Sequence, residues 1–219
     1  MQVVSYITII LILFLNILLP SNIAKPQSFE GEITFIKQTF KDTSFYKYKV
    51  KNNIIRIDEL DENLKLKNYM IVDLNKEEIY ALNPNKKLYT KLPIHPWQRN
   101  NNSKDYNIKK TQNYKIIKGY RCYQWRVKNK KENTEIAFWV TSDKFHFFYD
   151  FLKLINRIEK SSIYYLTIPE TKGFFPMLSV ERSLLREFKL KLSVMEIENK
   201  KMNSSLFKIP AGYRYFKRN

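Results

Sequence analysis

The side chains that could carry catalysis or bind a metal are few in this chain and lie far apart. Its two histidines, His95 and His146, are far apart in the sequence and belong to no metal-binding motif. His95 stands between prolines, where exposure to solvent is the ordinary interpretation. With 4 glycines in the whole chain there is no glycine-rich loop to bind a phosphate. We therefore expect no metal and no cofactor.

The single cysteine and one acidic cluster give equally little support to catalysis. Cys122 lies in the β-like run YRCYQW with no histidine or acid beside it, as a small buried hydrophobe would. One cysteine cannot form a disulfide within the chain. Four acids between Asp58 and Glu62 are of the type that a glycosidase pairs, but such a run at a turn is ordinarily a solvated loop. The sequence predicts a protein that is not an enzyme.

The N-terminal segment predicts export. Residues 1–24 contain no charged side chain, and their apolar run ends at Pro20 and Ala24 as a signal peptide does. The start lacks Lys and Arg, and Asn22 is a poor match to a cleavage site, so an uncleaved membrane anchor is the alternative. We expect a periplasmic or secreted protein with residues 1–24 as signal peptide and 25–219 as one domain, membrane-anchored if the leader is retained.

The charge of the chain favours anionic partners. The formal net charge is +18, and the stretch Arg99–Lys131 holds eleven basic residues against Asp105 alone. Outside the cytoplasm such charge meets lipid head groups or acidic glycans, whereas export argues against nucleic acid. The alternative is compositional drift, because the chain is also rich in Asn and Ile. The candidate contacts with an anionic membrane surface are Lys109, Lys110, Lys115 and Lys118.

The body of the chain reads as antiparallel β-structure. Phe188–Val194 alternates apolar residues with Lys and Ser, which places one face in an apolar interior. Turn-forming residues such as Asn52-Asn53 separate the runs and predict a meander that closes toward a half-barrel. The other predicted strands are 31–40, 44–51, 53–58, 69–74, 78–82, 87–91, 114–118, 120–128 and 134–141.

One segment has helical rather than strand periodicity. In Phe145–Ile158 the polar residues His146, Asp150, Lys153 and Arg157 fall on a single narrow stripe. The rest of the circumference is apolar, so the helix must be largely buried, and the concave face of a curved sheet is the natural place. The following segment, Ile168–Met177, mixes turn formers with large apolar residues and predicts a loop. Such a loop is either irregular core packing or a movable flap over a cavity.

Several motifs resemble the LolA/LolB-like envelope families. They are the opening Phe29–Phe35, the ladder Tyr69–Leu74 followed by Ile79–Asn83, the Lys118–Cys122 run and the ending Leu206–Tyr213. The chain is most similar to relatives of unknown function in that group. The resemblance implies an α+β, mainly β fold: a curved antiparallel half-barrel with helices covering its concave face and an apolar cavity between. Its best-known members carry lipoprotein acyl chains.

Two functions remain open from the sequence. The first is an exported protein that binds or carries a lipid or acylated ligand between sheet and helix. The second is a structural or interaction protein of the envelope whose aromatic residues fill that space themselves. For the first, the candidate cavity residues are Phe145, Phe148, Phe151, Leu152, Ile155, Phe174, Phe175 and Met177, the last group near the mouth.

Overall fold

The structure is a computed structural model. It describes residues 28–95, 97–98, 103–155 and 159–217. The predicted signal peptide, residues 1–24, and the end of the predicted helix, Arg157 and Ile158, lie outside the described residues.

Within these residues the chain forms twelve strands and two α-helices. The helices are α2 (Phe147–Ile155) and α3 (Lys160–Thr167), and short 3-10 turns occur at Ser103–Asp105 and Ser204–Phe207. No helix of the described part is long and apolar enough to cross a bilayer. The strands are β1 (Gly31–Thr39), β2 (Thr43–Lys51), β3 (Ile54–Leu60), β4 (Leu66–Asp73), β5 (Glu78–Asn83), β6 (Leu88–Leu92), β7 (Tyr106–Ile117), β8 (Tyr120–Asn129), β9 (Thr134–Ser142), β10 (Phe174–Arg182), β11 (Phe188–Asn199) and β12 (Arg214–Tyr215).

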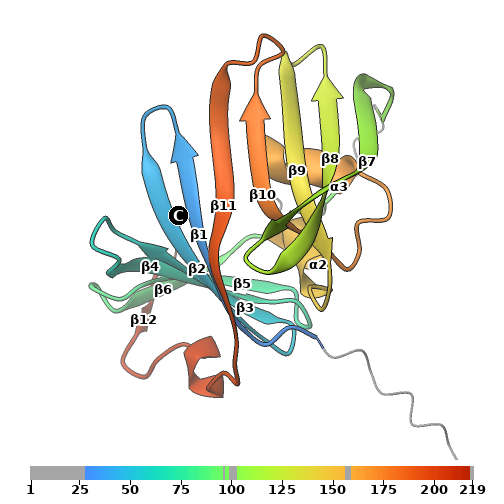
Figure 1. The fold of residues 1–219 in the computed structure, drawn as a ribbon. Coiled ribbons are helices and arrows are strands. Elements are labelled where there is room, and N and C mark those ends of the chain that lie inside the picture. The colour runs from blue at the N-terminus through green and yellow to red at the C-terminus, as the bar shows by residue number, and fades with distance from the viewer. Residues whose placement is uncertain (1–27, 96, 99–102, 156–158, 218–219) are drawn as a thin grey trace, which may run out of the picture.

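All twelve strands belong to one sheet, in the order β12-β6-β5-β4-β3-β2-β1-β11-β10-β9-β8-β7. Neighbouring strands are antiparallel except for the short pairing of β12 with β6. The sheet is open and strongly curved: β3 to β6 run across the direction of β8 to β11, and both helices lie behind β8 to β10 (Figure 1). This is the predicted curved antiparallel sheet with helices on its concave face.

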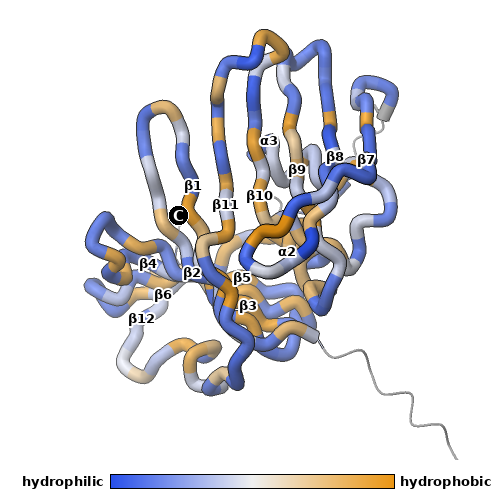
Figure 2. Tube along the Cα trace, viewed as in Figure 1, coloured by the Kyte–Doolittle hydropathy of each residue, from blue (hydrophilic) through white to orange (hydrophobic). Residues whose placement is uncertain are grey.

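The concave face carries the main core. Inward residues such as Ile33, Val50 and Ile136 are fully buried there, and they alternate with outward polar residues along their strands. Figure 2 shows the same alternation as bands of orange and blue along the strands. The predicted turn at Asn52 and Asn53 is present, with φ of 48° and 62°, the left-handed values that asparagine tolerates in a tight hairpin.

The beginning of β1 requires glycine. Gly31 has a φ of +153°, and a Cβ at this position would lie 2.0 Å from the carbonyl oxygen of Glu198 on β11. The close approach of these two strands joins the first strand of the chain to a late one. The glycine of the opening Phe29–Phe35 motif therefore serves the pairing that holds the two halves of the sheet together.

The C-terminal segment packs on the convex face of β3 to β6. Tyr69 and Leu82 form a second small core there, against which Ile209 and Tyr213 pack. Beside it Asp58 is 3% exposed and is held by Lys49 at 2.5 Å and Arg56 at 2.6 Å. Two cations and short hydrogen bonds compensate the burial of this carboxylate.

The prediction of a loop over Ile168–Met177 is wrong in its second half. Phe174, Phe175, Pro176 and Met177 begin β10, an interior strand between β9 and β11. Proline is tolerated because the register shifts between Pro176 and Leu178 at this point. Prolines and a glycine next to large apolar residues are typical of loops. The composition of this segment therefore predicts a loop, whereas pairing with β9 makes its second half a strand.

Other elements differ in extent from the sequence expectation. The predicted helix Phe145–Ile158 begins two residues later, as α2 (Phe147–Ile155), with its apolar side buried as expected, and residues 156–158 lie outside the described part of the chain. Strand β7 is longer than predicted and runs from Tyr106 through the basic stretch, interrupted by a bulge after Lys110. Helix α3 and strand β12 were not predicted, because neither is long enough to show a clear period.

Phe175 is expected to be a principal source of stability. Its side chain is 0% exposed and its ring contacts those of Phe145, Phe148 and Phe35. Phe175→Ala should lower the free energy of unfolding by about 3–5 kcal/mol, measured by urea denaturation. The matched control is Phe40→Ala, whose side chain is 87% exposed and which should change stability by less than about 0.5 kcal/mol. Equal effects of the two substitutions would contradict this account of the core.

Candidate functional site

The helix-covered half of the concave face is filled by aromatic rings. The ring of Phe175 lies 4.6 Å from that of Phe145 and 4.8 Å from that of Phe148, and Tyr48 meets Phe151 edge-on at 5.7 Å. The void between the apolar side of α2 and the sheet at Phe35 and Tyr48 has a volume of about 50 Å³. That volume holds one or two water molecules, at about 30 Å³ each, and not an acyl chain.

The predicted cavity residues all lie in or beside this core, but they differ in position. Phe148, Phe151, Leu152 and Ile155 line the small void. Three others are almost fully buried in the packed core: Phe145, Phe175 and Met177. Phe174 is half-buried on β10, where its ring lies 4.8 Å from that of Trp125. Phe175 and Met177 are 0% exposed, so neither lies at the mouth of a cavity.

The four predicted surface lysines do not share one face. Lys110 turns to the concave side, where its Nζ donates to the Pro169 carbonyl at 2.8 Å and lies 4.6 Å from the Trp125 ring. Lys115 lies over Trp139, and burial and the nearby Lys191 lower the pKa of its ammonium group. Lys109 and Lys118 are exposed, the latter in the β7–β8 turn. The bulge in β7 separates these side chains.

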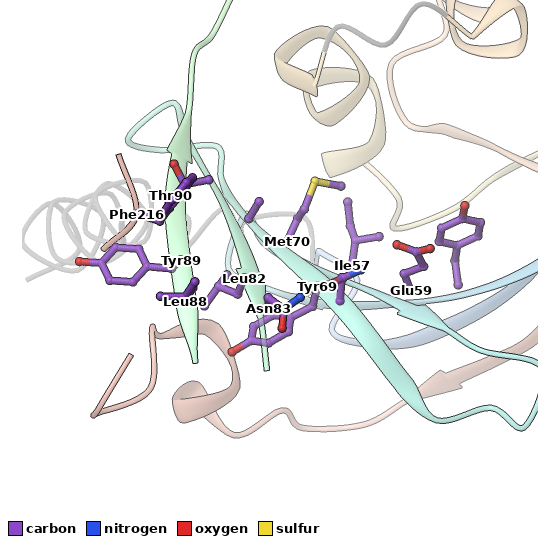
Figure 3. Close-up of a pocket in the computed structure, with 13 residues that line it drawn as sticks. Ile57, Glu59, Tyr69, Met70, Leu82, Asn83, Leu88, Tyr89, Thr90 and Phe216 are labelled. Carbon is purple, nitrogen blue, oxygen red and sulfur yellow. Dashed lines mark hydrogen bonds between the residues drawn. The ribbon is translucent and has the colours of Figure 1, made fainter. Parts of the chain in front are cut away.

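In β3 to β5, Ile55, Val72 and Ile79 are buried in the main core with α2, but the part of the concave face over Ile57, Met70, Ala81 and Thr90 is open. Helices α2 and α3 do not cover it, and it holds a cavity of about 460 Å³ (Figure 3). Cross-strand register aligns one row of side chains along its floor: Ile57, Met70, Ala81 and Thr90. In the close-up Met70 and Ile57 rise from the sheet on one side, while Tyr69 lies on the other near the C-terminal segment.

A second, more polar row forms one rim of this cavity. Register places Tyr46, Glu59, Asn68, Asn83 and Leu88 side by side across the strands. Asn83 donates to the side-chain oxygen of Asn68 at 3.1 Å. On the floor the hydroxyl oxygen of Thr90 is buried and has no hydrogen-bond partner in the described residues. The site therefore combines an apolar floor with a few placed polar groups, as small-molecule sites do.

The two ends of the cavity are defined by aromatic side chains. Tyr48 borders the helix-covered void and pairs in register with Ile57 of the open cavity, so it marks the boundary between the two halves. At the other end β12 pairs with β6, and Phe216 donates its backbone N–H to the Tyr89 carbonyl at 2.8 Å. Phe216 thereby lines the far end of the cavity.

Sequence reasoning did not find this site. Its floor residues are ordinary strand residues on four different elements, and nothing in their local spacing distinguishes them from a covered core. The alternation in residues 69–74 and 78–82 does indicate that the side chains of Met70 and Ala81 lie on the inner face of the sheet. What the alternation cannot show is that Val72 and Ile79 are buried in the core with α2, whereas Met70 and Ala81 on the same face line the cavity.

The described residues bring no catalytic set together. They contain no group of three His, Cys, Asp or Glu side chains that could hold a metal ion. Both histidines are exposed, and Cys122 is fully buried on β8. Burial raises the pKa of the Cys122 thiol to about 11. The one cysteine is thus a packed core residue, as its sequence context predicted.

Comparison with known proteins identifies the fold class and the family of this chain. One open curved sheet of twelve strands with two helices on its concave side is a LolA-like α+β fold. Residues 29–213 match the family model described as Domain of unknown function (DUF4412). The chain belongs to that family. No curated protein has a matching sequence.

The solved structures to which this chain is similar are distant in sequence. MucB in the Pseudomonas aeruginosa MucA/MucB complex shares 9% identity, with 83% of this chain covering 56% of that one, at a TM-score of 0.50. An uncharacterized conserved protein from Thermus thermophilus shares 10% identity, with coverage of 86% and 91% and a TM-score of 0.48. A putative outer membrane lipoprotein-sorting protein domain from Vibrio parahaemolyticus shares 8%, with coverage of 81% and 87% and a TM-score of 0.31.

The buried thiol gives a direct check of the core around β8. At pH 8 a thiol of pKa about 11 is almost entirely protonated, so Cys122 should react with Ellman's reagent at least about a hundredfold more slowly in the native protein than in urea. The reaction is followed by absorbance. A native rate close to that of the unfolded chain would show that Cys122 is accessible and that β8 is not packed as described.

Proposed function

We propose that this protein is an exported, non-enzymatic envelope protein that holds the acyl chain of a lipid or acylated ligand on the open half of its concave face. The observation that carries the proposal is the cavity of about 460 Å³ over β3 to β6. Ligand sites commonly have about 300–1,000 Å³. The floor row from Ile57 to Ala81 is apolar, and each methylene buried there contributes about 0.8 kcal/mol.

The polar row suggests how the other end of the ligand is held. Glu59 can only accept hydrogen bonds when ionised, and the Asn68 and Asn83 amides already pair with each other. A ligand whose polar end carries O–H or N–H donors suits Glu59, while Lys67, 3.3 Å from the Glu59 carboxylate, offers a donor to a ligand carboxylate. The buried Thr90 hydroxyl supplies a further hydrogen-bonding group at the floor.

The helix-covered half extends the same proposal. Phe148, Phe151, Leu152 and Ile155 would become a second part of the site if α2 moved away from Tyr48, with Phe145, Phe174, Phe175 and Met177 behind them. Such a movement would join the two spaces across the Tyr48 boundary. The open half needs no movement to accept a ligand, and it is the site that we propose first.

A second function is supported by a different observation. The aromatic rings leave only about 50 Å³ under α2, which suits a structural or interaction protein of the envelope with a self-filled core. MucB, which shares the fold, was solved in complex with MucA. Under this alternative the open concave half would bind the side chains of a partner protein instead of a lipid.

Native mass spectrometry separates the two functions. The protein is purified without detergent from cells that express the full chain, and lipids are extracted in parallel. The acyl-binding proposal predicts a reproducible added mass that resolves into an acylated molecule. An apo mass that stays unchanged after incubation with envelope lipids would reject this proposal and favour the interaction protein.

Ala81→Phe tests the location of the site. The added ring would fill the floor of the open cavity and displace about two methylenes of ligand, which should weaken binding of cis-parinaric acid about tenfold. The readout is the fluorescence of this fatty acid on titration. Ala211→Phe, an exposed turn position, is the matched control and should bind like the unmodified protein. Undiminished binding by Ala81→Phe would exclude the open half and move the site under α2.

A further inference from the structure

Two adjacent hairpins expose large apolar side chains at their tips. Phe40, between β1 and β2, is 87% exposed, and Leu185, between β10 and β11, is 80% exposed. The β1–β11 register ends with Thr39 opposite Leu190, so the two tips lie at the same edge of the sheet. Phe188, at the start of β11, adds a third apolar side chain that is 42% exposed. Figure 1 shows these two tips side by side at one end of the molecule.

The same end is basic. Lys41, Arg182 and Arg186 flank the three apolar side chains, and the neighbouring β8–β9 turn adds Lys130 and also Lys131, which pairs with Asp105 at 2.8 Å. That turn is tied to the β10–β11 tip, since Asn133 accepts a hydrogen bond from the Leu184 backbone N–H at 3.1 Å. Asp42 and Glu187 are the exposed acids of the two tips. Basic residues therefore outnumber acids around the apolar tips.

A depression on the convex face runs up to the Leu185 tip. It has a volume of about 230 Å³ and is lined by Arg126, Arg182 and Arg186 together with Glu135 and Trp139. Cross-strand register places Arg182 opposite Glu135, and Arg126 opposite Ala137 on the same face. Three guanidinium groups thus surround one carboxylate, and the depression keeps an excess of positive charge.

The arginines in this depression are not satisfied by Glu135. The closest atoms of Arg126 and Arg186 lie 3.8 Å and 3.7 Å from the Glu135 Oε1, beyond hydrogen-bond distance. The Nε of Arg126 is buried and has no hydrogen-bond partner in the described residues. Planar guanidinium donors in this arrangement suit the oxygens of a phosphate group.

We propose that this end of the sheet docks on a bilayer that contains anionic phospholipids. Phe40, Leu185 and Phe188 enter the acyl boundary, and Arg126, Arg182 and Arg186 bind the phosphate of a lipid head group. We call these six residues the tip surface. The apolar residues stand on protruding turns and do not line a groove, so a flat layer fits them better than a folded partner. Membrane attachment is stable when apolar side chains that enter the bilayer are combined with basic side chains that bind anionic head groups.

The tip surface is separate from the proposed acyl site. It lies at the hairpin tips and on the convex face, whereas the cavity over β3 to β6 opens on the concave face. Docking therefore does not depend on the acyl-binding proposal. Ala81→Phe should bind vesicles like the unmodified protein even where it loses cis-parinaric acid, so failure of one proposal can be told from failure of the other.

The test is co-sedimentation of the full chain with vesicles. Two compositions are compared: phosphatidylcholine alone, and phosphatidylcholine with phosphatidylglycerol. Phe40→Ser combined with Leu185→Ser should reduce binding to the anionic vesicles at least tenfold. The matched control combines Tyr114→Ser with Ile116→Ser, two side chains on β7 that are 57% and 60% exposed, and should bind normally.

The arginines are tested in the same assay. Arg182→Gln with Arg186→Gln should weaken binding to anionic vesicles roughly thirtyfold, since each basic residue at an anionic surface contributes about fivefold. Arg121→Gln with Arg214→Gln, two exposed arginines elsewhere, is the matched control. The Arg182/Arg186 variant should also show a weaker dependence of binding on salt.

Three results would overturn the proposal. The first is equal binding to neutral and anionic vesicles, and the second is equal binding by the tip variants and their controls. The third is sedimentation velocity that shows a concentration-dependent dimer, abolished by Phe40→Ser with Leu185→Ser, in a protein that does not bind vesicles. That result would assign the tip surface to a second copy of the chain.

Discussion

The packing of α2 against Phe175 is the interaction on which the rest of the structure depends. A strongly curved sheet must bury its concave face, and this chain supplies only two short helices for that purpose in its described part. Phe175 receives rings from β1, from the segment before α2 and from α2 itself, so the helix is held on the half of the sheet that contains β10. Because the rings leave almost no space, this half is a core in the ordinary sense.

The same arrangement leaves the part of the concave face over Ile57, Met70, Ala81 and Thr90 without a helical cover. Strands β3 to β6 are stabilised on their convex side instead, where the C-terminal segment packs on Tyr69 and Leu82 and where Asp58 is clamped by two cations. With that support the concave floor can remain partly exposed without loss of the sheet. An apolar floor that solvent can reach, bordered by a few polar groups, is the feature of this fold best suited to a ligand.

Much of the fold could be predicted from local pattern, and the failures have specific causes. Period-two alternation identified most strands, and a narrow polar stripe identified α2 and its burial. Strand β10 was mistaken for a loop because its first residues include proline and follow glycine, and its pairing comes from partners more than thirty positions away on β9. The open cavity was missed for a related reason. Its floor is assembled by register between four strands, and alternation assigns a face without telling what covers it.

By itself the sequence determined the fold class of the protein. Its alternating strands and one largely apolar helix define a mainly β chain with a buried helix, since these properties depend on residue type and local spacing alone. Only the tertiary structure decided where space is left. The aromatic residues that the sequence offered as a cavity pack against each other, and the cavity lies where no helix of the described residues reaches. The reason is physical: a void is a property of how elements meet, and it depends on helix length and strand register, which no single segment encodes.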